Sequence, residues 1–306
     1  MMNATTSNFP PGIAYMGGKY MPMEEAKISV LDWGFLRSDA TYDVVHVWKG
    51  RFFRLDKHIE RFLTSIEKLR LVLPFGRERL EEILKSCARR AGHEDAYVEM
   101  ILTRGVSPTY SRDPRDAIPT FIAFAIPFSW VGNEEQRKRG IDLHIASVER
   151  IPPGAVDPTV KNYHWLDFVS GLFEAYDVGA ENVVLVDGKG NIAEGPGFNI
   201  FAVTNGRVVT PATGVLQGIT RMTALELLDE LGVPASTEPL PIEALKDADE
   251  VFITSTAGGV MAVRTVNYQP FHAGAPGPMT RKLSALYWEK HGDPAWTTAV
   301  AGLKSL

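Results

Sequence analysis

Four separated segments of the chain carry side chains suited to covalent or acid–base chemistry, and the first of them contains Lys161. Lys161 follows Pro158 and precedes a helix predicted over residues 162–176, so its amine would project from the boundary of an element. An amine in a cleft can be kept neutral enough to attack an aldehyde. Since a single lysine is more often a solvated surface residue, this interpretation depends on the other three segments.

The second segment places Glu194 after a predicted hairpin at residues 187–191 and before Gly195 and Gly197. The two glycines would let the backbone approach a bound flat ring. A carboxylate beside a pyridine nitrogen favours the protonated, electron-poor ring, which draws charge from a substrate carbanion. The alternative is that Gly-Pro-Gly after a strand forms only a turn.

The remaining segments are suited to binding a phosphate. Gly218 opens a helix at Ile219 and Thr220, and the first N–H groups of a helix have no internal partner. The alternative there is an ordinary helix capped by Thr220. Residues 254–259 supply hydroxyls and flexible backbone, or else a polar turn. Arg61 offers a guanidinium with the planar geometry that suits phosphate, although a solvated charge on a helix is the alternative.

The elements that must position these side chains form two groups, of which the first is an α/β arrangement. It contains a β-hairpin with Gly50 at its tip and two helices, and Asp56 is expected to cap the first helix. Strands are expected at residues 17–22, 26–31, 42–48, 52–55, 96–102 and 120–126, and helices at 56–69 and 77–91.

The second group is rich in strands with helices between them. Strands are expected at residues 141–148, 183–187, 192–203, 207–209 and 250–255, and helices at 162–176, 220–231 and 279–291. The polar stretch 129–136 breaks the periodicity, so we predict a small α/β domain over residues 1–128, a linker over 129–136 and a larger domain over 137–306. The fold class is therefore mixed α/β. The irregular order of elements and the lack of G-x-G-x-x-G and P-loop sequences disfavour dinucleotide and Walker-type nucleotide binding.

Composition narrows the function further. A net charge of -5 gives no basic footprint for nucleic acid. The single cysteine, Cys87, excludes an internal disulfide and lacks the partners of a zinc site, so no metal is expected. No apolar run approaches the roughly 20 residues that span a bilayer, and the N-terminus does not resemble an export signal. We therefore expect a cytoplasmic protein without membrane or nucleic-acid partners.

Taken together, these segments resemble the fold-type IV pyridoxal-phosphate (PLP) family, which holds branched-chain and D-amino-acid aminotransferases and (R)-selective amine transaminases. The resemblance implies a two-domain enzyme that binds PLP between a smaller N-terminal and a larger C-terminal lobe, and a homodimer. It implies that Lys161 forms the Schiff base with PLP and that Glu194 contacts the pyridine nitrogen. The residues that it implies for the phosphate are Arg61, Ile219, Thr220 and Thr256.

Within that family the chain is most similar to the (R)-selective amine transaminases, through residues 34–43, 46–48, 97–99 and 161–165. Branched-chain enzymes usually carry a Tyr and Arg pair on the strand of residues 97–99, and the arginine is absent here. By analogy, the substrate pocket is formed by Tyr42, Tyr97, Glu99, Trp165, Thr256 and Ala257.

Two arginines leave the substrate class open. Arg37 stands where many relatives place His, and it either binds a carboxylate or points to solvent. Arg112 lies in a polar loop and either receives the carboxylate of the keto acid or is a solvated charge.

The preferred hypothesis is a ping-pong transaminase that moves an amino group from an (R)-configured primary amine to a keto acid such as pyruvate. In a second hypothesis the donor is a D-amino acid or a branched-chain amino acid, with Arg37 or Arg112 binding its carboxylate. A third hypothesis, from another class, is a catalytically silent α/β binding protein.

Overall fold

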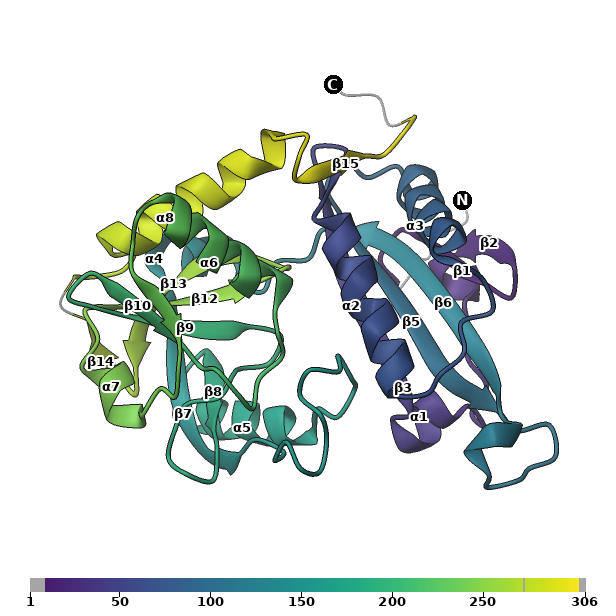
Figure 1. The fold of residues 1–306 in the computed structure, drawn as a ribbon, viewed down its shortest axis with the longest axis horizontal. Coiled ribbons are helices and arrows are strands. Elements are labelled where there is room, and N and C mark those ends of the chain that lie inside the picture. Colours follow the sequence, from purple (N-terminus) through teal and green to yellow (C-terminus); the bar gives the residue numbers. More distant parts are fainter. Residues whose placement is uncertain (1–8, 272, 303–306) are drawn as a thin grey trace, which may run out of the picture. The chain divides into compact units, whose positions relative to one another are not determined.

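The computed structural model describes residues 9–271 and 273–302, which fold into two compact units (Figure 1). The first unit contains the chain up to Ser129, the short segment Val160–Tyr163 and the segment from Pro294 onward. The second unit contains Trp130–Thr159 and His164–Asp293. This division differs from the one expected from sequence because two segments of the predicted larger domain pack with the first unit.

The first unit is built on a seven-stranded sheet in the order β15-β4-β3-β5-β6-β1-β2, with antiparallel neighbours throughout. Its strands are β1 (Ile13–Met16), β2 (Lys19–Pro22), β3 (Ala40–Trp48), β4 (Arg51–Phe53), β5 (Ala96–Val106), β6 (Ile118–Pro127) and β15 (Thr297–Ala299). Its helices are α1 (Trp33–Arg37), α2 (Leu55–Lys68) and α3 (Arg77–Ala91), with short 3-10 turns η1 (Met23–Glu25) and η2 (Pro114–Asp116).

The two faces of this sheet have different roles. Helices α2 and α3 cover one face, where Val45 and Val98 join an apolar core with Phe62 of α2. Because successive side chains of a strand point to opposite faces, the alternate residues of β3 and β5 point away from these helices. The register places Val44 of β3 opposite Glu99 of β5 on that other face. The sheet therefore presents a set of polar and aromatic side chains that does not belong to the helix-covered core.

The second unit is built on a mixed sheet in the order β11-β10-β9-β12-β13-β7-β8, with β14 beside β13. Its strands are β7 (Ile141–Glu149), β8 (Asn182–Val186), β9 (Asn199–Thr204), β10 (Arg207–Thr210), β11 (Ala235–Thr237), β12 (Glu250–Ser255), β13 (Gly259–Val266) and β14 (Gln269–Pro270). Its helices are α4 (Glu134–Arg139), α5 (Leu166–Asp177), α6 (Ile219–Glu230), α7 (Ile242–Lys246) and α8 (Pro278–Glu289), followed by η3 (Lys290–Gly292).

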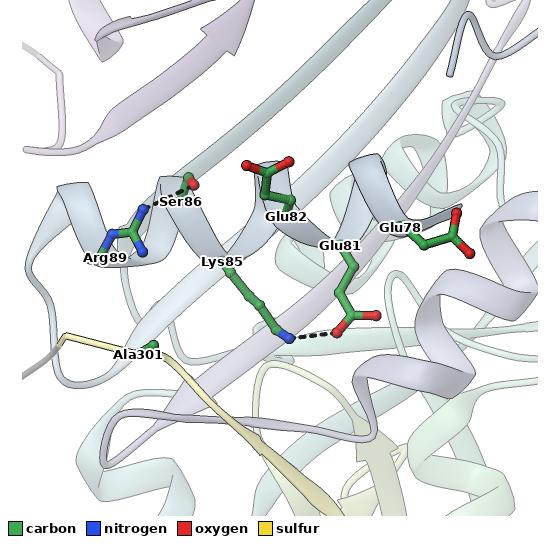
Figure 2. Close-up of a pocket in the computed structure, with 7 residues that line it drawn as sticks. All are labelled: Glu78, Glu81, Glu82, Lys85, Ser86, Arg89 and Ala301. Carbon is green, nitrogen blue, oxygen red and sulfur yellow. Dashed lines mark hydrogen bonds and ion pairs between the residues drawn. The ribbon is translucent and has the colours of Figure 1, made fainter. Parts of the chain in front are cut away.

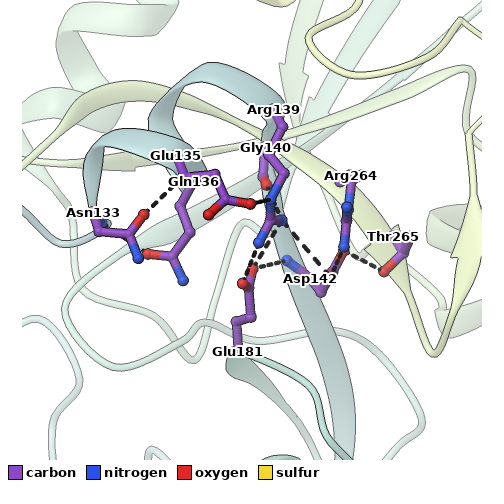
Figure 3. A network of polar contacts seen from close by, with 9 residues as sticks. All are labelled: Asn133, Glu135, Gln136, Arg139, Gly140, Asp142, Glu181, Arg264 and Thr265. Carbon is purple, nitrogen blue, oxygen red and sulfur yellow. Dashed lines mark hydrogen bonds and ion pairs between the residues drawn. The ribbon is translucent and has the colours of Figure 1, made fainter.

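A largely half-buried network of charges ties helix α4 to strands β7 and β13 of the second unit (Figure 3). Arg139 binds Glu181, whose carboxylate also accepts the backbone N–H of Asp142 at 3.0 Å. Arg264 in turn donates to Asp142, from Nε to Oδ1 at 2.8 Å. The network joins segments that are far apart in the sequence, and its role is therefore structural.

Most of the predicted elements are confirmed. The predicted mixed α/β class is confirmed, as are the helix over residues 77–91 and the strand over 250–255. The predicted strand over residues 26–31 is wrong, because these residues follow η1 without pairing into the sheet. The capping role of Asp56 is also wrong: α2 begins after Arg54, which adopts a left-handed conformation, and Asp56 lies inside the first turn.

Three further boundaries differ. The helix predicted from Asn162 begins only at Leu166, because Asn162 forms a β-bridge with Thr41 of β3. The strand predicted over 192–203 begins only at Asn199, since the preceding residues make a turn around Gly197 (φ +81°). Residues 134–136 of the predicted linker form the start of α4. None of the described helices is long and apolar enough to cross a membrane.

Candidate active site

Lys161 belongs to a short extended segment that is attached to the beginning of β3. Its carbonyl oxygen accepts hydrogen bonds from Thr41 Oγ1 at 2.8 Å and from the backbone N–H of Tyr42 at 3.2 Å. Asn162 continues this attachment by its bridge with Thr41, and its side-chain amide donates to the carbonyl of Val160 at 2.9 Å. The backbone on both sides of the Lys161 amine is therefore fixed to the sheet of the first unit.

The amine of Lys161 lies among tyrosines and one carboxylate. Its Nζ is 4.3 Å from the ring centre of Tyr42, and the Tyr42 ring stacks on Tyr163 with centroids 4.2 Å apart and planes at 10°. The hydroxyl of Tyr163 donates to Glu99 Oε1 at 2.8 Å. Burial raises the pKa of Glu99, while the hydrogen bond from Tyr163, the charge of Lys161 and a hydrogen bond from Tyr97 act in the opposite direction. The structure thus brings together Lys161, Tyr42, Tyr97 and Glu99, all four of which the sequence predicted as site residues.

A second polar group lies on the helix-covered side of the same sheet. Arg61 of α2 binds the fully buried Asp43 with two hydrogen bonds, Nε to Oδ2 at 2.7 Å and Nη2 to Oδ1 at 2.8 Å. His58 Nδ1 lies 2.8 Å from Asp43 Oδ1. Burial raises the pKa of Asp43, but Arg61 and His58 together lower it well below its usual range. Burial also lowers the pKa of His58, although Asp43 acts against this. The predicted phosphate ligand Arg61 is therefore oriented by a buried carboxylate.

The second unit holds the other predicted acid, Glu194, which is buried among hydrogen-bond donors. Its Oε2 accepts the backbone N–H of Leu216 at 2.9 Å and the amide of Asn199 at 3.4 Å. Its Oε1 accepts from Arg150 Nε at 3.3 Å, and Arg150 also donates to Asp167 at 2.7 Å. A cationic guanidinium and a backbone N–H both favour the charged form of a buried carboxylate.

Helix α6 begins directly beside this carboxylate. Asn199 connects the two, because its amide donates to Glu194 and to the carbonyl of Leu216, while its Oδ1 would lie 2.1 Å from a Cβ added to Gly218. Gly218 is the N-terminal cap of α6 and supplies no side-chain hydrogen bond, and the first turn contains no acidic residue. Ile219 and Thr220 occupy that turn and are buried. The helix therefore offers backbone N–H donors without the side-chain acceptor that usually caps them.

The end of β12 adds hydroxyl groups in the same unit. Ser255 Oγ donates to the carbonyl of Gly197 at 2.9 Å and lies 3.2 Å from the backbone nitrogen of Ala257. Thr254 Oγ1 is buried without a hydrogen-bond partner among the described residues. Thr256 and Ala257, both predicted site residues, are half-buried in the turn that follows. This segment has the form of a polar loop held next to the turn at Gly197.

The remaining predicted substrate residues are two exposed arginines of the first unit and Trp165, whose ring would lie 3.8 Å from a Cβ added to Gly197. Arg37 is exposed at the end of α1, and its guanidinium lies 3.8 Å from the ring centre of Trp33. Arg112 is exposed in the loop between β5 and β6. Trp165 belongs to the second unit, where its ring contacts Phe168 with centroids 5.5 Å apart. No contact among the described residues supports a role for Arg37 or Arg112 as a carboxylate ligand.

Sequence reasoning missed several residues that orient the predicted ones. Tyr163 lies in the segment 161–165 that carries the family resemblance, but the sequence assigns it no role, because its partner Glu99 is 64 residues away. Asp43 and His58 were also unassigned, although a buried acid on β3 and a His and Arg three positions apart on α2 are a local signal. Arg150 and Asp167 carry no such signal, since they lie 44 and 27 residues from Glu194 in the sequence.

A surface depression of about 400 Å³ lies elsewhere, along the exposed side of α3 (Figure 2). Its lining residues are Glu78, Glu81, Glu82, Lys85, Ser86, Arg89 and Ala301. None of these was predicted to act, and Lys85 is already paired with Glu81. Among the residues that the structure describes, no group of three or more His, Cys, Asp or Glu side chains is placed to hold a metal ion.

Comparison with known sequences gives one consistent result. The model of the amino-transferase class IV family matches residues 40–266. A putative branched-chain-amino-acid aminotransferase of Methanocaldococcus jannaschii is 34% identical, over 88% of this chain and 93% of that protein. A D-alanine aminotransferase of Bacillus licheniformis is 28% identical, over 87% of this chain and 92% of that protein.

Solved structures agree with the sequence comparison. The branched-chain aminotransferase of Thermoproteus uzoniensis with norvaline matches with a TM-score of 0.87 at 26% identity, over 95% of this chain and 99% of that one. A second branched-chain amino acid aminotransferase, solved with pyridoxamine 5'-phosphate, matches with a TM-score of 0.88 at 28% identity, over the same shares of the two chains. Both likenesses extend over nearly the whole length of the chain.

Proposed function

Because the chain belongs to the class IV aminotransferase family, we propose that it moves an amino group from an (R)-configured primary amine to a keto acid such as pyruvate. The chain is a PLP-dependent aminotransferase with an amino donor and a keto acid acceptor as substrates. What we propose is the identity of the donor, and the side chains gathered around Lys161 support it.

The residues of the second unit fit the two ends of PLP. The buried Glu194 carboxylate, which accepts a hydrogen bond from the Arg150 guanidinium, suits a protonated ring nitrogen. The uncapped start of α6 suits a phosphate, and Gly218 is the residue that the close approach of Asn199 requires there. We therefore propose Ile219, Thr220 and Thr256 as phosphate ligands in this unit, and Arg61 as the phosphate ligand that the first unit supplies.

The chemistry that PLP supplies is an aldehyde that accepts the amino group and a ring that withdraws electrons. Lys161 would hold that aldehyde through Nζ until the donor amine displaces it, and Nζ would then take the proton from the donor carbon and pass it to the former aldehyde carbon. Thr41 and the backbone of Tyr42 hold Lys161 in place for this transfer. Asp43 orients Arg61 by its two hydrogen bonds.

The surroundings of Lys161 favour a donor without a carboxylate. Tyr42, Tyr163 and Tyr97 supply apolar ring surface, which suits an aryl or alkyl substituent. Glu99 adds a carboxylate beside these rings, and a negative charge there would repel the carboxylate of an α-amino acid. This arrangement of one acid among tyrosines is the single observation on which the amine proposal depends.

The names of the relatives favour an alternative donor. The M. jannaschii protein is named for branched-chain amino acids and the B. licheniformis protein for D-alanine. For such a donor, Arg37 or Arg112 would have to leave its exposed position and bind the carboxylate.

A donor panel separates these functions. The purified holoprotein is mixed with (R)-1-phenylethylamine, (S)-1-phenylethylamine, D-alanine or L-leucine, and the cofactor absorbance is followed before and after pyruvate is added. The proposal predicts loss of the absorbance band with the (R)-amine and its return with pyruvate, and parallel lines in a two-substrate rate plot. Faster reaction with D-alanine or L-leucine than with the (R)-amine would contradict it.

We also propose that the protein is a cytoplasmic homodimer. Large apolar side chains are exposed in both units, among them Val30 at 71% and Phe35 at 67% in the first and Phe173 at 63% in the second. Apolar surface of this kind is typical of a face that another subunit covers. Light scattering during size-exclusion chromatography should give twice the mass of one chain, and the mass of a single chain at micromolar concentration would refute the dimer.

A further inference from the structure

Tyr163 makes two contacts that join Lys161 to a buried acid, and the proposed reaction gives Tyr163 no role in the position of Lys161. Its ring stacks on Tyr42, over which the Lys161 amine lies, and its hydroxyl donates to Glu99. All four residues belong to the first unit. One side chain thus supports both the aromatic surface and the carboxylate that surround the amine.

We propose that Tyr163 is a positioning residue, which holds the Lys161 amine between the ring of Tyr42 and the carboxylate of Glu99. The inference rests on the proposed function for the reaction that Lys161 performs. It concerns only contacts within the first unit.

The backbone explains why Tyr163 can act on Lys161. The segment 160–163 is extended and bridged to Thr41, and side chains two residues apart in an extended chain point to the same side. Lys161 and Tyr163 therefore both face Tyr42, whose own backbone N–H donates to the carbonyl of Lys161 at 3.2 Å. A displacement of the Tyr163 ring would leave the Tyr42 ring without its 4.2 Å neighbour.

The electrostatics give this arrangement its function. The face of an aromatic ring and a carboxylate both attract a cationic amine, so Tyr42 and Glu99 can fix the position of the Lys161 Nζ. Burial favours the neutral form of Glu99, and the Tyr163 hydrogen bond opposes that effect by lowering the pKa of Glu99. Tyr163 therefore helps Glu99 to stay charged, and a charged Glu99 attracts the Lys161 amine and so helps to position it.

Several other titratable groups act on Glu99 and on the neighbouring His58. Tyr97 donates to Glu99 and Asp43 raises its pKa, while Lys161 lowers it. Asp43, Arg61 and Lys161 all act on the pKa of His58. Only Glu99 among these loses a described hydrogen bond when the hydroxyl of Tyr163 is removed.

Two substitutions separate the two contacts. Tyr163→Phe keeps the ring stack and removes the hydrogen bond, whereas Tyr163→Leu removes both. Tyr20→Phe is the matched control, because Tyr20 lies on β2 against Tyr15 and Arg90. In the holoenzyme we expect Tyr163→Phe to lower kcat roughly tenfold with little change in KM, and Tyr163→Leu to lower it about a hundredfold. Tyr20→Phe should match the wild type.

The pH profile distinguishes positioning from a merely structural role. Loss of the hydrogen bond raises the pKa of Glu99 further, so the acidic limb of the kcat profile of Tyr163→Phe should move to higher pH. In a Glu99→Gln background, Tyr163→Phe should have little additional effect on kcat. A Tyr163→Phe protein with an unmoved acidic limb, or an effect that is fully additive with Glu99→Gln, overturns the inference.

A readout on the apoprotein keeps this test separate from the donor panel. Apoprotein is incubated with pyridoxal, reduced with borohydride and digested, and the labelled fraction of the Lys161 peptide is measured by mass spectrometry against pH. We expect the labelling curves of Tyr163→Phe and Tyr163→Leu to shift relative to those of the wild type and Tyr20→Phe. If all four proteins label alike, the inference fails even when the wild type is active; if the curves shift while the wild type rejects every donor, the proposed function fails and the inference stands.

Discussion

The two buried glutamates among the proposed site residues are held in opposite ways, one in each unit. Glu99 in the first unit accepts a hydrogen bond from a neutral phenol, and burial raises its pKa. Glu194 in the second unit accepts from a guanidinium, an amide and a backbone N–H. Cationic and backbone donors stabilise a permanent negative charge, whereas a phenol leaves the carboxylate able to take up a proton. The difference is that the donors to Glu194 include a cation, whereas the described donors to Glu99 are neutral phenols, so we expect the charge of Glu99 to depend more on its surroundings.

The largest effect should come from neutralising each acid in turn. Glu194→Gln removes the carboxylate that we propose for the PLP ring nitrogen, so kcat should fall by about 100-fold or more with every donor. Glu99→Gln should lower kcat less and raise the rate with D-alanine relative to (R)-1-phenylethylamine, because it removes a repulsive charge. Steady-state kinetics with both donors would measure this, and equal losses from the two substitutions would break the comparison.

Removing the partners of the acids should affect stability unequally. Arg150→Met removes the guanidinium that donates to the buried Glu194, and the loss of one member of a buried ion pair costs roughly 3 kcal/mol or more. Tyr163→Phe removes a neutral hydrogen bond and should cost about 1 kcal/mol. The free energy of unfolding in urea measures both, with Arg207→Met, an exposed ion pair of the same unit, as the matched control. A smaller loss for Arg150→Met than for Tyr163→Phe would refute the account.

The pH dependence of stability should have opposite signs for two acids of the first unit. The folded-state pKa of Asp43 is lowered, so its stabilising contribution is present above its unfolded pKa of about 4 and is lost as the pH falls through the lowered value. The folded-state pKa of Glu99 is raised, so its charged form destabilises the fold. This loss of stability is absent below the unfolded pKa of about 4 and grows as the pH rises from there to the raised folded-state pKa.

Urea unfolding between pH 3 and pH 7 checks these signs. The stability difference between the wild type and Asp43→Asn should shrink toward low pH, because the wild type loses the contribution of the charged carboxylate. The stability of Glu99→Gln relative to the wild type should instead increase toward high pH. If both differences are plotted as variant minus wild type, the slope should be negative for Asp43→Asn and positive for Glu99→Gln; slopes of the same sign would contradict the assignment of charge to these groups.

The smallest change in the free energy of unfolding is expected in the charge network of Figure 3. Arg264 pairs with Asp142 there, but its side chain is 44% exposed, and exposed pairs contribute less than about 1 kcal/mol. Arg264→Met should therefore lower the free energy of unfolding only slightly, and roughly 1 M salt should remove most of the difference. A loss as large as that of Arg150→Met would mean that burial does not decide the strength of these contacts.

The sequence predicted the acids and the lysine because each stands at a recognisable boundary. Lys161, Glu194 and Gly218 each precede or follow an element whose end is marked by proline, glycine or a change of periodicity. Long periodic elements such as α3 and β12 were equally accessible. The predicted roles of these residues remain part of the proposal, whereas the family and the mixed α/β fold are confirmed.

What the sequence did not reveal depends on contacts between distant segments. Asn162 is in a stretch whose pattern predicts the start of a helix, but its bridge to Thr41, 121 residues earlier, holds it in an extended form. The hydrogen bond from Tyr163 to Glu99 spans 64 residues, and that from Leu216 to Glu194 spans 22. No local pattern encodes such pairs, since tertiary packing overrides the preference of the segment.

The most direct test of the central claim identifies the lysine that binds PLP. The holoprotein is reduced with borohydride, digested and sequenced by tandem mass spectrometry, with Lys161→Ala as the control. The account predicts one phosphopyridoxyl group on the peptide that contains Lys161 and none in the variant. A phosphopyridoxyl group on another lysine of the wild type, or none on Lys161, would contradict it.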